Sequence, residues 1–429
     1  MKAALSIATL FTLGLSAKAA NLTLVQEYSG SSFFDKWDFY GDSFSGQAGL
    51  WNSTPYDDTT NGDVFYMGRA NGSSLYNVDS TTGHAFIKLD NTSSVDYEQK
   101  RDSIRITTQD AFTTGSVFVI DAYHLPWGCS VWPGIWTKGE NWPEDGEIDI
   151  VEGVNRMTYN QMALHTVTGC TASTGSFTQS GQAGTTDCAP GSGCTVIEKQ
   201  ANSYGPDFES NGGGVWATQF DQTGVFIWFW SRADVPDSIT SATDSIDISS
   251  WGTPSAAYSS STCDINKFFG PQHLVVDITL CGDWAGDTSN YEATCNDTPT
   301  LPADADPKQR CYVDNVINNG TADYAMAYFE FASIRIFSSN STAVVSPTSS
   351  ASGTSGTVSS LAAGATASVT GTGGKSGAGS TVAGSGSGSA ATSASDSSST
   401  GSTGAGAMIS PNMVGALTAL CTMFAWMLL

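Results

Sequence analysis

The chain has 429 residues, of which 40% are hydrophobic, enough for one large domain or two ordinary ones. Its 41 acidic residues outnumber its 17 basic residues, so the formal net charge is −24 at pH 7. Phosphate binding needs clustered Lys and Arg, and this composition therefore argues against a nucleic-acid partner.

The first 19 residues have the three parts of a secretory signal peptide. Lys2 supplies a positive charge, residues 3–15 form an apolar run, and residues 17–19 read Ala-Lys-Ala, a small-x-small cleavage site. The apolar run is too short to span a membrane. We therefore expect residues 1–19 to be removed and the mature chain to follow the secretory route.

Residues 20–338 are rich in aromatic and β-branched residues, and we expect them to form one domain. Alternation with a period of two residues and short apolar runs predict strands at 103–107, 117–120, 147–150, 224–230, 274–278 and 333–337. Clusters of Gly, Asn, Asp and Ser separate these runs, and no long stretch has helical periodicity. The predicted fold class is all-β, a sandwich of two antiparallel sheets of the jelly-roll type.

Acidic residues are concentrated in the sequence GEIDIVEG at 146–153. Alternate residues of a strand share a face, so Glu147 and Asp149 point to the same side. Strict alternation would send Glu152 to the opposite face. A β-bulge near residues 150–151 would return Glu152 to the face of Glu147, and bulges are frequent beside active sites.

Three carboxylates on one face repel one another, and such crowding separates their pKa values. Glycoside hydrolysis uses this separation, because it needs one ionised and one protonated carboxyl group. A calcium site also requires clustered carboxylates, and a solvated acidic strand requires no function. From these residues alone, catalysis and metal binding stay open as alternatives.

Tryptophans are frequent on both sides of this acidic strand, at positions 127, 132, 136, 142, 216, 228, 230, 251 and 284. Aromatic rings stack on the apolar faces of sugar rings and bury a large area. The alternative is that several of these tryptophans are core residues, and for any single Trp this is the more frequent case. The aromatic content thus favours a carbohydrate ligand without identifying which rings contact it.

The chain has nine cysteines, and Cys421 lies in the apolar C-terminal segment. The other eight are Cys129, Cys170, Cys188, Cys194, Cys263, Cys281, Cys295 and Cys311. An even number in a secreted chain predicts disulfides. Their pairing cannot be read from the spacing, although Cys188 and Cys194 could close a small loop. A zinc site is a weak alternative, because the chain lacks CxxC pairs and its four His are scattered.

The C-terminal region has two parts that differ from the domain. Residues 339–412 are almost wholly Ser, Gly, Ala and Thr, so they cannot bury a core, and we expect a disordered stalk. Residues 413–429 are apolar and follow small residues and a short spacer, as in a glycosylphosphatidylinositol (GPI) attachment signal. We expect attachment at Ser402 and removal of a propeptide that starts near residue 403. An ordinary tail anchor is the alternative.

Motifs in the domain resemble glycoside hydrolase family 16, in particular the fungal endo-1,3(4)-β-glucanases, or laminarinases. The carrying motifs are GCSVWPGIW at 128–136, NWP at 141–143 and GEIDIVEGVN at 146–155. Supporting motifs are LHT at 164–166, GGGVWA at 212–217 and CGDWAG at 281–286. The resemblance implies a jelly-roll sandwich with an open substrate cleft. It also implies endo-cleavage of β-1,3- or mixed β-1,3/1,4-glucans with retention of configuration, without a metal or other cofactor.

The resemblance also implies roles for individual residues. Glu147 corresponds to the nucleophile, Glu152 to the acid/base, and Asp149 to a carboxylate that orients the nucleophile. The residues that correspond to substrate-binding positions of the cleft are Trp132, Trp136, His165 and Trp284. For His165 a purely structural role stays open. The retaining mechanism requires the two catalytic carboxyl groups to lie about 5–5.5 Å apart.

Two other functions are compatible with the same fold. A cell-wall transglycosylase of this family would move glucan chains onto acceptors, but such relatives space the carboxylates as E-x-D-x-E, whereas this chain has E-x-D-x-x-E. A non-catalytic glucan-binding protein would typically lack the two glutamates, which are present here. We expect a monomeric β-glucan hydrolase, anchored at the outer face of the plasma membrane or transferred to the cell wall. Residues 171–211, which follow the family pattern least, leave the glucan preference open.

Overall fold

The computed structural model describes residues 21–44, 59–172, 177–189, 191–295, 307–340 and 342–346. The predicted signal peptide and anchor tail, with Ser402, lie outside these residues, and so do residues 347–412 of the predicted stalk. Residues 339–340 and 342–346, which the prediction placed at the start of the stalk, are described, and Val344 and Val345 pair with Phe112 and Ala111 of the domain. None of the helices in the described ranges is long and apolar enough to cross a membrane.

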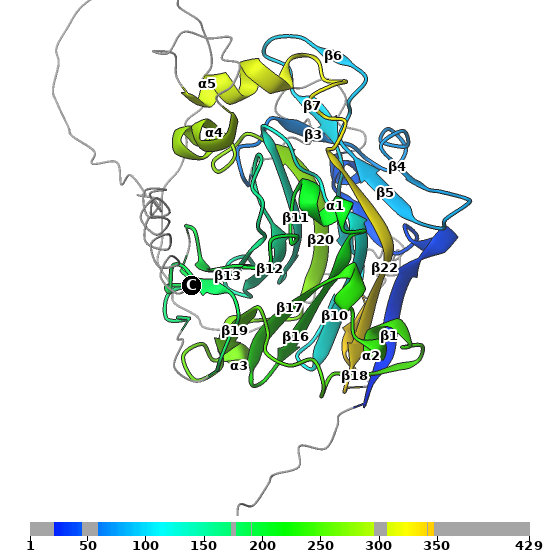
Figure 1. The fold of residues 1–429 in the computed structure, drawn as a ribbon, viewed down its shortest axis with the longest axis vertical. Helices are drawn as coiled ribbons and strands as arrows, with labels where there is room; N and C mark the ends of the chain where they lie inside the picture. The colour runs from blue at the N-terminus through cyan, green and yellow to red at the C-terminus, as the bar shows by residue number, and fades with distance from the viewer. Residues whose placement is uncertain are drawn as a thin grey trace, which may run out of the picture. The chain divides into compact units, whose positions relative to one another are not determined.

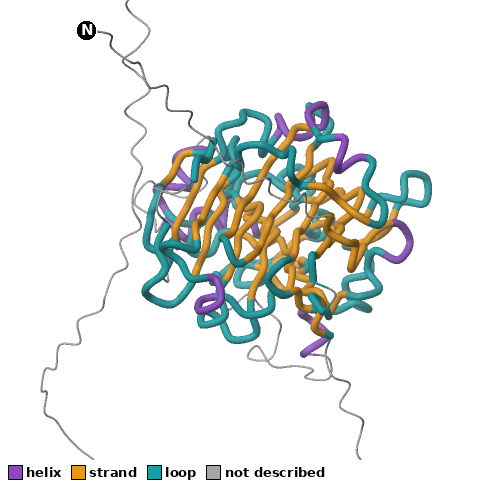
Figure 2. Tube along the Cα trace, turned by 90° about the horizontal axis from the view of Figure 1, so that it is seen from below, coloured by secondary structure: helices purple, strands orange, loops and turns teal. Residues whose placement is uncertain are grey.

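Antiparallel pairing joins most of the strands into two large sheets, which Figure 1 shows as two layers and Figure 2 shows as side-by-side orange strands. The main path of the nine-stranded sheet runs β18 (Ser245–Asp247), β1 (Asn21–Ser29), β22 (Tyr328–Ser338), β10 (Ser116–His124), β16 (Gly214–Asp221), β17 (Gly224–Ser231) and β19 (Ala256–Ser259). Strand β5 (Ala85–Lys88) also pairs with β22, and β4 (Tyr76–Val78) pairs with β5. The predicted all-β jelly-roll class is confirmed.

The eight-stranded sheet carries the acidic segment. Its order is β14 (Gln182–Ala183), β15 (Cys194–Ile197), β13 (Gln161–His165), β12 (Glu147–Glu152), β11 (Val131–Lys138), β20 (His273–Leu280), β8 (Arg105–Thr108) and β2 (Trp37–Phe39). Strand β12 therefore lies near the middle of the sheet, with paired strands on both sides. This location fixes the backbone of the acidic segment on both edges.

The remaining elements are short. The other strands are β3 (Val64–Tyr66), β6 (Ser94–Val95), β7 (Arg101–Ser103), β9 (Ala111–Phe112), β21 (Asn318–Asn319) and β23 (Val344–Val345). The helices are η1 (Gly30–Ser32), η2 (Tyr40–Phe44), α1 (Pro206–Ser210), η4 (Arg232–Asp234), α2 (Asp237–Thr240), α3 (Ile265–Phe268), α4 (Thr288–Cys295), α5 (Pro307–Cys311) and η5 (Tyr312–Val316).

One predicted strand differs from the structure, because 103–107 is divided into β7 and β8 at Ile104. Strand β7 pairs with β3 in parallel, whereas β8 pairs with β2 and β20 in the large sheet. Ile104 is fully buried at the point where the chain changes partners. The alternation of the sequence continues through this break, which is why periodicity alone did not reveal it.

The core lies between the two sheets. Phe118 and Ile120 of β10 meet Ile148 and Ile150 of β12 in one buried cluster, so each sheet supplies every second residue of its strands. Burial of one such side chain contributes about 1.5–3 kcal/mol. The opposite face of β12 is thereby left to the polar residues of the acidic segment.

A second apolar cluster covers the outer face of the nine-stranded sheet. Trp228 and Trp251 are buried there, and their indole N–H groups donate to the carbonyl of Gly252 and to Ser238 Oγ. Trp216 is also fully buried, in the main core. These three tryptophans are therefore core residues, and the alternative of a purely structural role applies to them.

All eight cysteines of the predicted domain form disulfides. The pairs are Cys129–Cys295, Cys170–Cys263, Cys188–Cys194 and Cys281–Cys311. The small loop predicted between Cys188 and Cys194 is confirmed. The other three pairs join segments that are far apart in the sequence, and spacing could not predict them.

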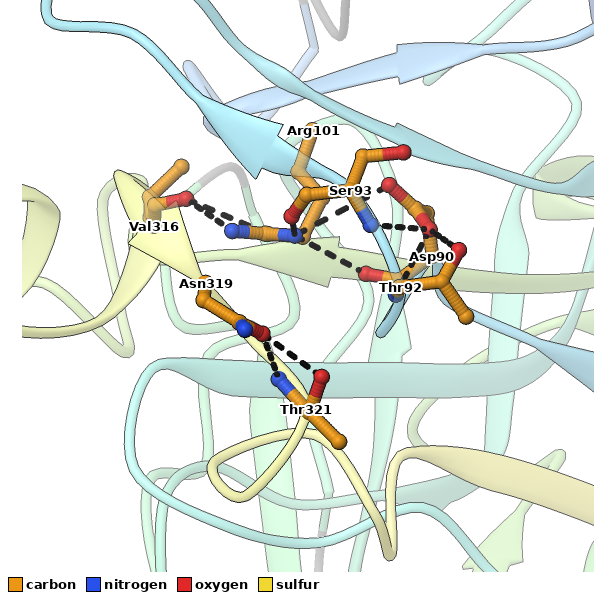
Figure 3. A network of polar contacts seen from close by, with 7 residues as sticks. All are labelled: Asp90, Thr92, Ser93, Arg101, Val316, Asn319 and Thr321. Atoms are coloured by element: carbon orange, nitrogen blue, oxygen red, sulfur yellow. Dashed lines mark hydrogen bonds and ion pairs between the residues drawn. The ribbon is translucent and has the colours of Figure 1, made fainter.

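A buried arginine of β7 bonds residues 90–93 and the end of η5, as Figure 3 shows. Arg101 is fully buried and donates to the carbonyl oxygens of Val316, Asp90 and Ser93. The Asp90 carboxylate lies 3.8 Å from the guanidinium. A buried guanidinium is tolerated only when its N–H groups and charge are satisfied, and these contacts supply both.

Candidate active site

The site is built on a β-bulge in β12. Across β11, Ile135 pairs with Val151 and Trp136 pairs with Asp149, so Ile150 is an extra residue. The β12–β13 register also shifts, between Asp149 and Glu152. The predicted bulge at residues 150–151 is therefore confirmed, and it returns Glu152 to the face that carries Glu147 and Asp149.

The two glutamates are each held by an indole N–H group. Trp142 Nε1 donates to Glu147 Oε2 at 2.5 Å, and Trp132 Nε1 donates to Glu152 Oε1 at 2.8 Å. Both carboxyl groups are partly buried, and Asp149 between them is only 3% exposed. A hydrogen bond from a fixed indole restricts the carboxyl group to one orientation.

Burial raises the pKa of all three carboxyl groups, and the charge of Asp149 adds to this effect for Glu147 and Glu152. Burial, followed by the charge of Asp149, raises the pKa of Glu147 to about 8. Burial raises the pKa of Asp149 to about 7, and burial with the charge of Asp149 raises the pKa of Glu152 well above its usual range. The cluster therefore retains protons at neutral pH, as a site that needs both a carboxylic acid and a carboxylate must.

His165 lies opposite Glu147 in the β12–β13 register, and its Nε2 is 3.2 Å from Asp149 Oδ2. The disulfide loop between Cys188 and Cys194 covers the ring, because a Cβ atom at Gly193 would lie 2.9 Å from His165 Nε2. Gly193 also has a φ of +61°, which favours glycine. The loop thus holds the predicted cleft histidine against the carboxyl cluster.

Glu147, Asp149 and His165 form a potential ligand set for a metal ion, since each offers an atom within 4.8 Å of the others. Calcium prefers roughly six to eight oxygen ligands, whereas two carboxylates and an imidazole suit a transition metal. The described residues therefore give the calcium alternative little support. The indole donors favour the catalytic interpretation, because an N–H group that occupies a carboxylate oxygen competes with a cation.

Trp136 lies across the strand beside the cluster. Its Nε1 donates to Asp277 Oδ1 at 3.2 Å, and the guanidinium of Arg105 is 5.1 Å from its ring centre. A Cβ atom at position 134 would lie 2.8 Å from Trp136 Cδ1 and 2.9 Å from Asp277 Oδ1. The absence of a side chain at Gly134 is therefore what gives the indole its space.

Trp284 completes an aromatic pair with Trp132, with ring centres 5.6 Å apart in an edge-to-face arrangement. The segment that carries Trp284 is fixed by Asn155, which donates from Nδ2 to the carbonyl of Ala285 and accepts from the N–H of Ser130. The structure thus brings Trp132, Trp136, His165 and Trp284 together around the carboxyl cluster.

The sequence analysis did not identify three residues that belong to the site: Arg105, Trp142 and Asp277. Arg105 and Asp277 are paired across β8 and β20, with the guanidinium 3.9 Å from the carboxylate. Each is a charged residue in an otherwise uncharged strand, and this pattern could have identified Arg105 and Asp277 as site residues. Trp142 lies in a connecting segment and is 50% exposed, so strand periodicity did not indicate it, and the available signal was the NWP motif at 141–143.

Comparisons with known proteins agree with this geometry. The model of XgeA-like catalytic domains of glycoside hydrolase family 16 matches residues 51–337. A Schizosaccharomyces pombe protein described as a probable glycosidase is 35% identical over 328 residues, which cover 75% of this chain and 70% of that protein. The endo-1,3(4)-β-glucanase xgeA of Emericella nidulans is 33% identical over 345 residues, 79% of this chain. The chain spans about half, 51%, of the length of that relative.

Two solved structures are similar in fold and sequence. Laminarinase 16A of Phanerochaete chrysosporium, solved with β-glucans in donor and acceptor sites, has a TM-score of 0.63 and 31% identity, covering 74% of this chain and 100% of its own. An elongating β-1,3-glucosyltransferase of family 16 has a TM-score of 0.63 and 33% identity, covering 74% of this chain and 99% of its own. The family match, the identity to these relatives and the shared fold agree, and the chain therefore belongs to glycoside hydrolase family 16.

Proposed function

We propose that this chain cleaves internal bonds of β-1,3- or mixed β-1,3/1,4-glucans with retention of configuration. The observation that carries the proposal is the bulge in β12, which puts Glu147 and Glu152 on one face with Asp149 between them. Retaining glycosidases use two such carboxyl groups, one as nucleophile and one as acid and then base. The XgeA-like relatives and the laminarinase with bound β-glucans support this class of substrate.

In the first step Glu147 attacks the anomeric carbon while Glu152 gives its proton to the departing oxygen. The raised pKa of Glu152 keeps that proton on the carboxyl group at neutral pH. The hydrogen bond between Glu147 and Asp149 raises the pKa of Glu147 and lowers that of Asp149, so the shared proton rests on Glu147 and must move to Asp149 before Glu147 attacks. The N–H of Trp142 stabilises the carboxylate form of Glu147.

The second step requires Glu152 to act as a base. The negative charge of Glu147 contributes to the raised pKa of Glu152, and this charge disappears when Glu147 forms the glycosyl ester. The pKa of Glu152 therefore falls in the intermediate, so that it can take a proton from the attacking water. Water then releases the sugar, and Glu147 is again a carboxylate.

Transfer of the glycosyl group to a sugar acceptor is the second candidate. A sugar hydroxyl can replace water in the second step, since Glu152 would deprotonate either one. The similar glucosyltransferase structure supports this possibility. Products longer than the substrate, formed when an oligosaccharide acceptor is added, would favour transfer over hydrolysis.

The test is a substrate panel with the purified chain: laminarin, mixed-linkage β-glucan, cellulose and chitin, with product lengths and anomeric configuration measured. We expect internal cleavage of the first two substrates and β-configured initial products. Glu152→Gln should abolish hydrolysis while circular dichroism stays unchanged. Activity of a folded Glu152→Gln protein close to the wild-type value would refute the assignment.

We further propose that the enzyme acts outside the cell as a monomer. The apolar residues 413–429, the Ser402 attachment position and the Ser/Gly/Ala/Thr-rich sequence before them support a GPI-anchored protein at the outer face of the plasma membrane or in the cell wall. Release of the protein from cells by a GPI-specific phospholipase, with loss of release in a chain truncated at residue 412, would test the anchor.

A further inference from the structure

Two backbone groups of the bulge are bonded by a single side chain. The amide oxygen of Asn160 accepts from the N–H of Glu152 at 2.8 Å, and its Nδ2 donates to the carbonyl of Ile150 at 2.9 Å. Asn160 directly precedes β13, the strand whose register shifts at the bulge. Its side chain therefore bonds the backbone on both sides of Val151.

The position of Asn160 is itself fixed by its backbone. Its N–H donates to Ser203 Oγ at 3.1 Å, and its carbonyl accepts from the N–H of Glu198 at 2.9 Å. The residue is fully buried. Water is therefore a poor substitute for its amide, and the two bulge contacts depend on the side chain.

The chemistry of these two contacts selects asparagine. One backbone group is a donor and the other is an acceptor, and a carboxamide offers one acceptor and one donor in a fixed plane. An ionised carboxylate would accept from Glu152 but would repel the carbonyl of Ile150. An apolar side chain would leave both groups without this partner in a buried place.

We infer that Asn160 is the positioning residue that maintains the bulge and thereby aims Glu152 at the departing oxygen. Without the bulge, alternation would send Glu152 to the face opposite Glu147. Asn160 contacts the backbone of Glu152 rather than its carboxyl group, so it acts through Glu152. This inference rests on the proposed function, in which Glu152 is the acid/base.

The kinetic test compares a substrate that needs the acid with one that does not. Laminarin hydrolysis requires proton transfer from Glu152, whereas 2,4-dinitrophenyl β-laminaribioside loses its leaving group as an unprotonated anion when Glu147 attacks. For Asn160→Ala and Asn160→Asp we expect kcat/KM on laminarin to fall by about 100-fold or more. The pre-steady-state burst of dinitrophenolate should stay within about 10-fold of the wild-type rate.

The Asn160→Asp variant adds a pH signature. When the new carboxyl group is protonated, it can donate to the carbonyl of Ile150 and restore the second contact. Laminarin activity relative to wild type should therefore rise as the pH falls, whereas the same ratio for Asn160→Ala should stay flat. A flat ratio for both variants would contradict the role of the donor contact.

Asn315→Ala is the matched control, because Asn315 is also a buried asparagine whose Nδ2 bonds two groups, Tyr291 OH and the carbonyl of Cys311. We expect it to reduce thermal stability and to affect both substrates equally. Equal losses on both substrates for the Asn160 variants, or laminarin activity within about 10-fold of wild type, would overturn the inference.

Amide hydrogen exchange separates the inference from the proposed function. The N–H of Glu152 should be protected in the wild type and should lose protection in Asn160→Ala, while the Asn315→Ala control keeps it. Wild-type protein that cleaves neither substrate would refute the proposed function, and the exchange result alone would then decide on the bulge. Unchanged protection of Glu152 in Asn160→Ala would overturn the inference.

Discussion

Glu147→Gln should stabilise the fold at neutral pH while it abolishes catalysis. Burial and the charge of Asp149 raise the pKa of Glu147 from 4.5 to about 8. The folded state therefore binds this proton more tightly than the unfolded state, and the associated stability is complete below pH 4.5 and is lost as the pH rises towards 8. At pH 7 the stability lost in this way has an upper limit of about 3 kcal/mol, since one pKa unit corresponds to about 1.4 kcal/mol.

The neutral amide of Glu147→Gln does not lose this stability as the pH rises, but two effects reduce the gain. The carboxyl group is partly exposed, and solvent screens its repulsion with Asp149. The strong hydrogen bond from Trp142 also weakens when its acceptor loses its charge. We therefore expect a net gain of about 1 kcal/mol at pH 7, or roughly 2 °C in Tm.

The measurement is the difference in Tm between Glu147→Gln and wild type, by calorimetry, at pH 4, 5.5, 7 and 8. The difference should be near zero at pH 4, where both states of the wild type are largely protonated, and should grow with pH. Glu140→Gln is the control, because Glu140 is highly exposed. A Tm difference that is independent of pH, or that decreases as the pH rises, would refute the reasoning.

Three further predictions concern other residues. Trp142→Phe removes a donor that lowers the pKa of Glu147, so the acid limb of the kcat/KM profile should move to higher pH; an unchanged limb would contradict this. Gly134→Ala should displace the indole of Trp136 and raise KM for laminarin several-fold with a smaller effect on kcat; unchanged KM would show that the ring tolerates the methyl group. Arg101→Met leaves buried carbonyl groups without donors and should cost about 3 kcal/mol or more in urea unfolding, without a change in pH profile.

The sequence predicted the fold class because strand periodicity is a local property. Alternation of residue types in β8, β12, β20 and β22 indicates strands, whichever strands are their neighbours. Periodicity does not specify pairing, so the division of 103–107 between β7 and β8 became visible only with the sheets. The same limit explains why three of the four disulfides could not be assigned.

Strand β12 shows how far such reasoning extends. The spacing of Glu147 and Glu152 required a bulge if both were to lie on one face of the strand, and the register of β11 and β12 contains it. The sequence did not reveal what maintains the bulge, because the Asn160 contacts depend on how β13 is placed beside β12. Nor did it separate the buried Trp216 from Trp132, since both lie in alternating strands.

The sequence by itself determined the strand class, the three carboxylates on one strand and the need for a bulge, because each follows from residues close together in the chain. Only the tertiary structure decided which partners those carboxylates have. The indole of Trp142, the ring of His165 and the charges of Asp277 and Arg105 come from other segments. Burial between those segments is what raises the pKa values of the cluster, and burial is a property of the packed sheets.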